Sequence, residues 1–381
     1  MSASRLAHSW GWILGASAAV SLVACSGPYQ QPLARRQINP DTHTHSSHDA
    51  ESGLVVNEPV IPAGDSLAER TIAYAQLRER AFGLLLSAAS GESAEERANA
   101  IEALIQSPPR LKGVAGAALA DSSPAVRGIA AMAVGKARLT ELASQLRPLI
   151  SDQFPQVRAN AIFALLRCDQ PVDPTPLAEM LNSPRPQVRA QAAFVLGELG
   201  EKSAVGPLRE AHRHGLAKAS PAAVRLMELQ IAEARAKLGD DDGLIDIRTA
   251  LFPARAEDLE ATALAAQIVG QIGDRASVDR LMYLTAEWDR DKQPLPAEIR
   301  LAAASSLAKL GRRQGSFIAD QYKANESDIL RAQAALVYGD TGWLENLPTL
   351  TAMLDDPSGR VRVAAASAIV RITSSAGGLD R

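Results

Sequence analysis

Apolar residues recur at helical spacing along most of this chain, behind an arginine that returns at a nearly constant interval. The interval is 30 to 36 residues, except for one of 75 residues that has room for one more unit around Leu259 and Glu260. Behind each arginine, apolar residues follow in steps of three and four, as in Val126, Ala130 and Val134. The pattern predicts nine helices that begin with a similar phrase. Eight of them carry an arginine in that phrase: Arg97, Arg127, Arg158, Arg189, Arg225, Arg300, Arg331 and Arg362.

Each repeated phrase also carries the signals that start a helix. A polar residue six positions before several of the arginines can cap the helix, and a proline three to five positions before them suits its first turn. The third residue after the arginine is alanine in seven of the eight phrases, which lets neighbouring helices approach closely. Second amphipathic segments lie between these helices, for example over 142–150, 177–181, 278–288 and 344–354.

Hairpins of two such helices cannot bury their apolar faces alone and must stack on one another. Over 66–373 the phrase resembles the HEAT repeat, in the short variety named after phycobilisome lyases. The resemblance implies an all-α fold, a right-handed α-solenoid of about nine HEAT-like helical hairpins. We expect this array to be elongated and to present an extended concave surface.

The same resemblance implies a role for the arginines. In that family an aspartate near the turn and the arginine of the phrase form a ladder between neighbouring repeats. Carried over to this chain, the aspartates would pair with the arginines of the same or a neighbouring phrase, and Arg189 would belong to the same column. The alternative is a row of arginines that binds anions. The ladder residues are Asp121, Arg127, Asp152, Arg158, Arg189, Asp356 and Arg362.

The N-terminal 65 residues lack this period. An apolar run from Trp10 to Ala24 ends at Cys25, and Leu22-Val23-Ala24-Cys25 resembles the bacterial lipobox, in which lipid is attached to the cysteine thiol. The resemblance implies a signal peptide over 1–24 and, with Ser26, a lipid anchor in the outer membrane facing the periplasm. An uncleaved signal anchor is the alternative, since 6–24 holds 19 uncharged residues and nearly spans a bilayer.

A proline-rich segment over 25–65 follows, and its composition predicts a disordered tether at the cell envelope, as does 374–381 for a disordered tail. His43, His45 and His48 in this tether are weak candidates to bind zinc, copper or nickel. Because nothing near them would orient the imidazoles, adventitious metal binding is the favoured interpretation.

Composition excludes several classes of function. With 40 Lys and Arg against 43 Asp and Glu, the net charge of −3 excludes a generic nucleic-acid binder. The 26 glycines include no phosphate-binding motif, and 66–373 contains only two histidines. Deoxyhypusine hydroxylase uses similar repeats and binds iron through His-Glu pairs, but no His-Glu dipeptide occurs here. We therefore predict no catalytic residue, no cofactor and no small-molecule substrate; an envelope enzyme or enzyme subunit, an oxidoreductase or a lyase, is the alternative.

The middle of the array is acidic, because 240–300 holds 13 acids and 7 bases. Glu260 in this stretch lies near the arginine column, and Glu228, just upstream of the stretch, replaces the packing alanine. We predict a non-catalytic, membrane-anchored scaffold that binds a basic partner protein here; the alternative is a degenerate repeat with Trp288 in its core. The candidate partner surface is Glu260, Tyr283, Trp288, Asp289 and Asp291.

Overall fold

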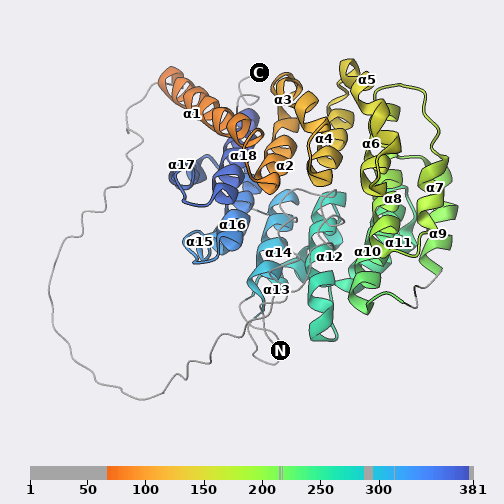
Figure 1. Cartoon of the computed structure of the whole chain (residues 1–381). Helices are drawn as coiled ribbons and strands as arrows, with labels where there is room; N and C mark the ends of the chain where they lie inside the picture. The colour runs from red at the N-terminus through yellow and green to blue at the C-terminus, as the bar shows by residue number, and fades with distance from the viewer. Residues whose placement is uncertain (1–66, 214–215, 217, 287–294, 313, 377–381) are drawn as a thin grey trace, which may run out of the picture.

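The computed structural model describes residues 67–213, 216, 218–286, 295–312 and 314–376 (Figure 1). Within these residues the regular secondary structure is entirely helical, and consecutive helices pack as neighbouring hairpins. This confirms the all-α solenoid that the repeated phrase predicts.

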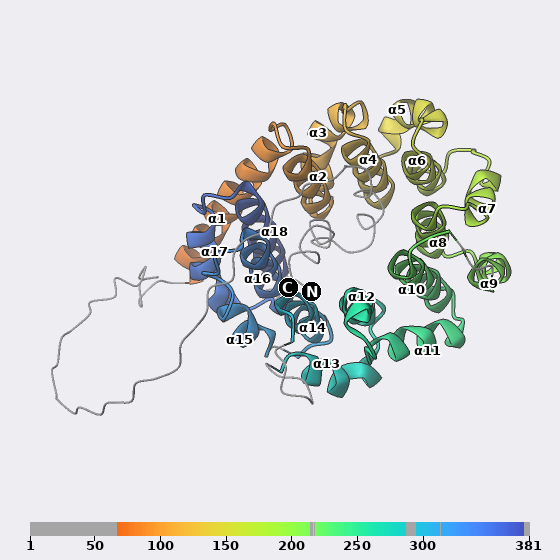
Figure 2. The ribbon, with the colours of Figure 1, turned by 60° about the horizontal axis from the view of Figure 1, so that its bottom comes forward.

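Helices of two kinds alternate along the described chain. Those that begin with the repeated phrase form the inner layer (Figure 2). They are α2 (Ala94–Ala103), α4 (Pro124–Ala137), α6 (Pro155–Arg167), α8 (Pro186–Leu199), α10 (Pro221–Lys237), α12 (Leu259–Ile272), α14 (Ala297–Lys309), α16 (Asp328–Thr341) and α18 (Gly359–Ala376).

A second set of helices, most of them shorter, connects the inner helices and forms the outer layer, several after a 3-10 turn such as Thr140–Leu142. One further helix, α1 (Leu67–Ala88), precedes the first hairpin. The outer helices are α3 (Pro108–Leu119), α5 (Ala143–Leu146), α7 (Thr175–Leu181), α9 (Val205–Arg213), α11 (Asp241–Ala250), α13 (Val278–Leu284), α15 (Gly315–Asp320) and α17 (Leu347–Met353).

The sequence signals act where they were expected at the helix ends. Pro124, Pro155 and Pro186 are the first residues of their helices, where the missing N–H of proline breaks no hydrogen bond. At the other end of α8, Gly200 has a φ of 80°, a left-handed conformation that costs glycine little and allows the chain to leave the helix.

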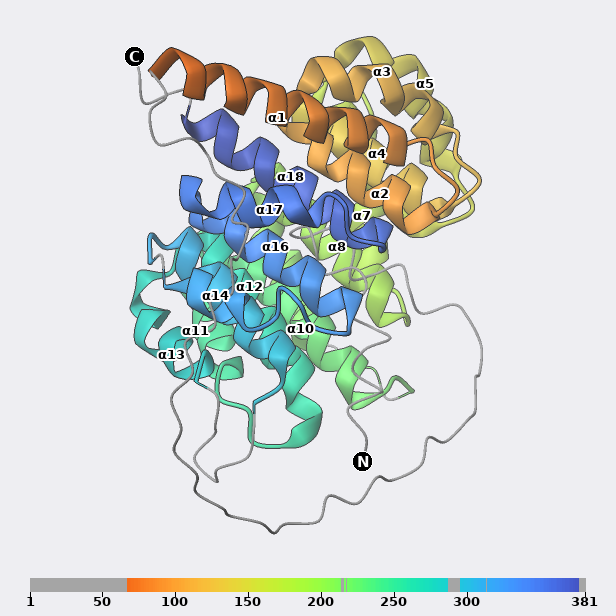
Figure 3. The ribbon, with the colours of Figure 1, turned by 90° about the vertical axis from the view of Figure 1, so that its left-hand side faces the viewer.

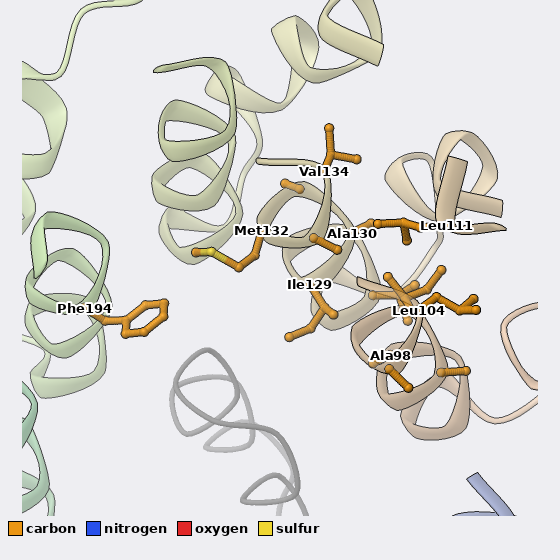
Figure 4. Close-up of a cluster of buried hydrophobic side chains, with 14 of the residues drawn as sticks. Ala98, Leu104, Leu111, Ile129, Ala130, Met132, Val134 and Phe194 are labelled. Atoms are coloured by element: carbon orange, nitrogen blue, oxygen red, sulfur yellow. The ribbon is translucent and has the colours of Figure 1, made fainter. Parts of the chain in front are cut away.

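Small side chains set the spacing between the inner helices. The alanine three residues after the arginine is fully buried in each of the seven phrases that carry it: Ala100, Ala130, Ala161, Ala192, Ala303, Ala334 and Ala365. Figure 4 shows Leu104, Leu111 and Ala130 filling the space between α2, α3 and α4, while Phe194 extends from α8 some way off. The core therefore depends on close approach of backbones rather than on large rings.

Glycine permits the closest of these approaches. A Cβ on Gly135 of α4 would lie 2.7 Å from the Cα of Ala164 on α6, and one on Gly339 of α16 would lie 2.9 Å from the Cα of Ala368 on α18. In both pairs the glycine is eight residues after its arginine and the alanine is six residues after the next one. We call this relation the packing register: the residue eight positions after one arginine packs against the residue six positions after the next arginine.

The array is not elongated, because it curls through a full turn and closes on itself. Helix α18 packs against both α1 and α2, so the last inner helix lies beside the first (Figures 2 and 3). One cluster of buried apolar side chains includes Ala81 of α1 and Ile372 of α18 and so continues across this seam. The predicted extended concave surface is instead the inside of a ring.

Candidate functional site

The interior of the ring holds a cavity of about 450 Å³ beside the seam. Its walls come from the first two inner helices, α2 and α4, and from the last four, α12, α14, α16 and α18. The lining side chains lie mostly two, five and nine residues after the arginine of each phrase, so these helices turn the same face toward the cavity. Closure thus brings residues from the two ends of the chain into one site.

The column nine residues after the arginine is charged. By the packing register it contains five bases, two acids and two glutamines: Gln106, Lys136, Arg167, Glu198, Lys237, Gln271, Lys309, Asp340 and Arg371. Cations at this position also suit the C-terminal ends of the inner helices, where the helix dipole is negative.

Each acid of this column lies between two of its bases. Glu198 accepts from Lys136 at 3.4 Å and from Lys237 at 2.7 Å. Burial raises the pKa of Glu198, but the charges of these two lysines outweigh burial and hold the pKa below its usual value. Asp340 likewise pairs with Arg371 and, at 3.6 Å, with Lys309. The Asp340 cluster therefore carries one more base than acid, whereas Lys237 also pairs with Glu233, at 2.6 Å, which balances the Glu198 cluster.

Glu102 lies in the cavity wall, five residues after Arg97 on α2. Burial raises the pKa of its carboxyl to about 7, although the positive charges of Lys136 on α4 and Arg371 on α18 lower it. Lys136 belongs to the next repeat and Arg371 to the last one, so the electrostatic environment of Glu102 exists only in the closed ring.

Two amide side chains in the cavity wall have buried atoms without hydrogen bonds. They are Nδ2 of Asn99 on α2 and Oε1 of Gln333 on α16. Both residues are two positions after the arginine of their phrase, and Gln333 is only 9% exposed. Buried polar atoms without a partner cost free energy, so these two are available for a ligand.

The ladder residues lie away from this cavity, at the turns between repeats. Arg127 donates two hydrogen bonds to the carboxylate of Asp152, at 2.9 and 3.2 Å, and Arg97 contacts Asp121 in the same way at 2.7 and 2.9 Å. Asp356 accepts the equivalent pair from Arg331. Each arginine thus reaches the aspartate of the following repeat.

The same arginines also close their own turns. Nη1 of Arg127, Arg158 and Arg362 donates to backbone carbonyls five and six residues earlier. Arg158 makes no ion pair with any described residue, because the repeat after it has Ser183 at the aspartate position. Arg189 is buried and donates to the carbonyls of Ser183 and Ala211, and burial lowers its pKa.

The register of two middle repeats differs from the prediction. A Cβ on Gly197 would meet Ala234, so the arginine column of α10 passes through Glu228 and the packing alanine is replaced by the buried Ile231. Helix α10 has three more residues than α8, which places Arg225 one turn too early. It still forms an ion pair with Asp258.

The same relation places α12. A Cβ on Gly270 would meet Ser306, which puts Thr262, rather than Glu260, in the arginine column. Asp240, just before α11, is buried and accepts from Arg209 and Arg235, whose hydrogen bonds hold its pKa well below the usual range.

Of the predicted partner surface, Glu260 and Tyr283 are described, and Trp288, Asp289 and Asp291 lie outside the described residues. Tyr283 is partly buried and belongs to a group of side chains on the outer layer. The guanidinium of Arg280 lies 4.7 Å from the centre of its ring and 4.2 Å from that of Phe252. Phe252 is 58% exposed and Met282 is 50% exposed. We call Phe252, Arg280, Met282 and Tyr283 the outer patch.

Cys25, His43, His45 and His48 also lie outside the described residues. Within the described part of the chain, no group of three or more histidine, cysteine or acidic side chains could hold a metal ion. None of the helices described is both long and apolar enough to cross a bilayer. Cys168 is fully buried at the end of α6, and burial raises the pKa of its thiol.

Comparison with protein families agrees with the repeat and the helical hairpins. A family model of HEAT repeats matches 82–166 and 111–184, and a second model, of a HEAT repeat, matches 347–376. The chain is a HEAT-repeat protein. The matched segments lie on both sides of the seam, so HEAT hairpins form both ends of the ring. No curated protein matches the sequence.

Among solved structures, the HEAT ring is similar to human deoxyhypusine hydroxylase in complex with glycerol and to two engineered proteins, all at 16% identity. The hydroxylase match covers 72% of this chain and 99% of that one, with a TM-score of 0.35. The engineered proteins cover 81% and 68% of this chain and 96% and 95% of their own, with TM-scores of 0.31 and 0.30.

The cavity of this HEAT protein was not predicted from the sequence, although a signal for it exists. The column nine residues after the arginine is polar or charged in every repeat, whereas the columns beside it are largely apolar. An inward-facing charged column is visible only once the packing register of α10 and α12 is known, because their phrases are shifted or incomplete.

Proposed function

We propose that this HEAT ring is a non-catalytic, lipid-anchored binding protein of the bacterial cell envelope, and that its outer patch docks a basic partner protein. Support for the anchor comes from the sequence around Cys25, where an apolar run ends in a lipobox-like motif. Two or three acyl chains there would hold the ring at the membrane, facing the periplasm.

The observation that carries the docking proposal is the outer patch itself. Aromatic, methionine and arginine side chains are the types enriched at the centres of protein interfaces. Exposed acids on α11, on α13 and in the segment between α11 and α12, such as Asp242, Asp279 and Glu257, give this region the charge that a basic partner would complement. The array's inner face is turned into the ring, which leaves the outer face for a folded partner.

In-cell photo-crosslinking tests the docking proposal. A crosslinking residue at Met282 should capture one dominant protein with a basic surface, identified by mass spectrometry. The matched control is Phe317 on α15, which is 64% exposed on the outer layer but outside the patch. Equal capture at the two positions would show that the patch has no specific partner.

Charge reversal tests the role of the acids. Asp279→Lys, and Glu260→Lys combined with reversal of Asp289 and Asp291, should weaken capture, and by less at high salt, where these charges are screened, while Glu345→Lys just before α17 should not. All variants should retain the wild-type helical melting curve. Undiminished capture by the reversed variants would contradict an acidic docking surface.

The anchor has its own test. Cys25→Ala should leave an unprocessed precursor and release the protein from membranes, and globomycin should accumulate the same precursor in the wild type. Unchanged membrane fractionation of the Cys25→Ala variant would favour the uncleaved signal anchor.

A second candidate, an envelope enzyme or enzyme subunit, is favoured by one observation. The inner helices gather ionisable groups, since Glu102, Lys136 and Arg371 lie within electrostatic range of one another across three helices. Turnover of a compound bound in the cavity would support this candidate over a pure binding role.

A further inference from the structure

The cavity beside the seam has an excess of positive charge near its wall. Four bases line the cavity, Lys136, Lys309, Arg360 and Arg371, against three acids, Glu102, Glu298 and Asp340, and Asp340 is shared by Lys309 and Arg371. Lys136, Lys309 and Arg371 all line the cavity. An anionic group bound among them would balance the remaining charge, and the confined site would strengthen that attraction.

The unpartnered amides add a second requirement. Nδ2 of Asn99 is a donor and Oε1 of Gln333 is an acceptor, and each lacks a hydrogen bond. Both residues line the cavity, so a ligand bound there lies beside the two amides. A peptide group offers the complement of both, because its carbonyl accepts and its N–H donates. A bare inorganic anion at neutral pH has few protons or none to donate to Oε1 of Gln333.

Size and lining limit the ligand further. A cavity of about 450 Å³ lies within the usual range of small-molecule sites. Leu301, Leu336 and Val337 provide apolar wall between the polar groups, on which an aliphatic part of the ligand can pack. A ligand of a few residues fits these dimensions, and a folded domain does not.

We propose that the cavity binds a small carboxylate-bearing amide, of the class of short acidic peptides and acylated acidic amino acids. Its carboxylate lies among Lys136, Lys309 and Arg371, and its amide lies between Asn99 and Gln333. Glu102 supports this arrangement, since burial raises its pKa to about 7 and its neutral form can donate to a bound carboxylate. This site is independent of the outer patch, so either proposal can fail without the other.

Calorimetry on the full chain in detergent tests the proposal with two probes that differ only in one group. Acetyl-Ala-Glu-amide carries the carboxylate and acetyl-Ala-Gln-amide does not. The acidic probe should saturate the protein with a Kd at least about tenfold lower than that of the neutral one. Equal binding of the two probes, or no saturation by the acidic probe at about 1 mM, would overturn the proposal.

Variants locate the binding. Lys309→Met should weaken the acidic probe about tenfold, because Asp340 keeps its pair with Arg371 and only the surplus charge is lost. Gln333→Leu should weaken both probes, since it removes the amide acceptor. Lys112→Met is the matched control, because Lys112 pairs with Glu141 on the outer layer, away from the cavity. Thermal melts show that each variant folds, and Gln333→Ala replaces Gln333→Leu if that variant does not.

Two further outcomes would contradict the proposal. If inorganic phosphate competes with the acidic probe at similar concentrations, the cavity is a general anion site that does not recognise the amide. Equal weakening by Lys112→Met would show that the probe responds to net charge rather than to the cavity.

Discussion

Arg360, near the start of α18, donates two hydrogen bonds to the carboxylate of Glu95 on α2, at 2.6 and 2.7 Å, across 265 residues of sequence. The two side chains are 19% and 26% exposed, so the pair is partly shielded from water. Arg360 also lies 3.6 Å from Asp328 of α16. One guanidinium thus joins the last repeats to the first.

Loss of this pair should weaken the seam. Arg360→Met should lower the free energy of unfolding by about 1 to 3 kcal/mol, because it leaves the Glu95 carboxylate partly buried without its partner. Small-angle scattering should show a larger radius of gyration if the seam opens. Arg80→Met is the control: Arg80 pairs with Asp355 across the same seam, but both side chains are well exposed, so the cost should be under about 1 kcal/mol. Equal effects of the two variants would contradict a special role for Arg360.

The ladder predicts a difference between two arginines of the same column. Arg127→Lys removes the two-point contact with Asp152 as well as the bonds to its own turn, and should cost about 2 to 3 kcal/mol in a chemical denaturation curve. Arg158→Lys loses only the bonds to its own turn and should cost about 1 kcal/mol. A reversed order would mean that the inter-repeat contact adds nothing.

Glycine positions allow a test of the close helix approach. Gly135→Ala places a Cβ 2.7 Å from the Cα of Ala164, so the helices must separate, and the melting temperature should fall by several degrees. Gly83→Ala and Gly113→Ala are matched controls in other helices, where a Cβ meets nothing within 4 Å. These two should be neutral or stabilising by up to about 1 kcal/mol, because alanine is the better helix former. A stable Gly135→Ala protein would refute the packing register.

The raised pKa of Glu102 predicts a pH-dependent stability. Between its ordinary value of 4.5 and about 7, the folded state holds a proton that the unfolded state releases. Unfolding free energy should therefore fall as the pH rises through this window, by about 3 kcal/mol at most, relative to Glu102→Gln. Urea denaturation of both proteins at pH 5 and pH 8 measures the difference. A parallel pH dependence of the two proteins would show that Glu102 titrates normally.

The sequence predicted those features that repeat and are local. Helix starts such as Pro155, and buried alanines such as Ala161, depend on neighbouring residues within one phrase, so a single phrase is enough to recognise them. The position of Arg225 shows where this fails. The start signals Ser220 and Pro221 set where α10 begins, but the contact of Gly197 with Ala234 sets where it packs, and an extra turn separates the two.

Closure of the ring could not be predicted in the same way. It depends on the sum of small rotations between successive repeats, and no single phrase encodes that sum. Glu95 and Arg360 have the pattern of ordinary surface charges, and only the fold brings them together. The cavity inherits this limit, since Glu102 and Arg371 become neighbours through the seam.

The seam has a consequence for how such a chain can change during evolution. An open solenoid grows by duplication of a repeat, because each unit contacts only its neighbours and the ends remain as they were. In this protein every repeat supplies a share of one full turn, and α1 and α18 cover each other's apolar faces. An inserted or deleted repeat would carry α18 past or short of α1 and leave both faces in water. Repeat number is therefore fixed by geometry, and the chain can diversify only by substitution within its units and by growth of its loops.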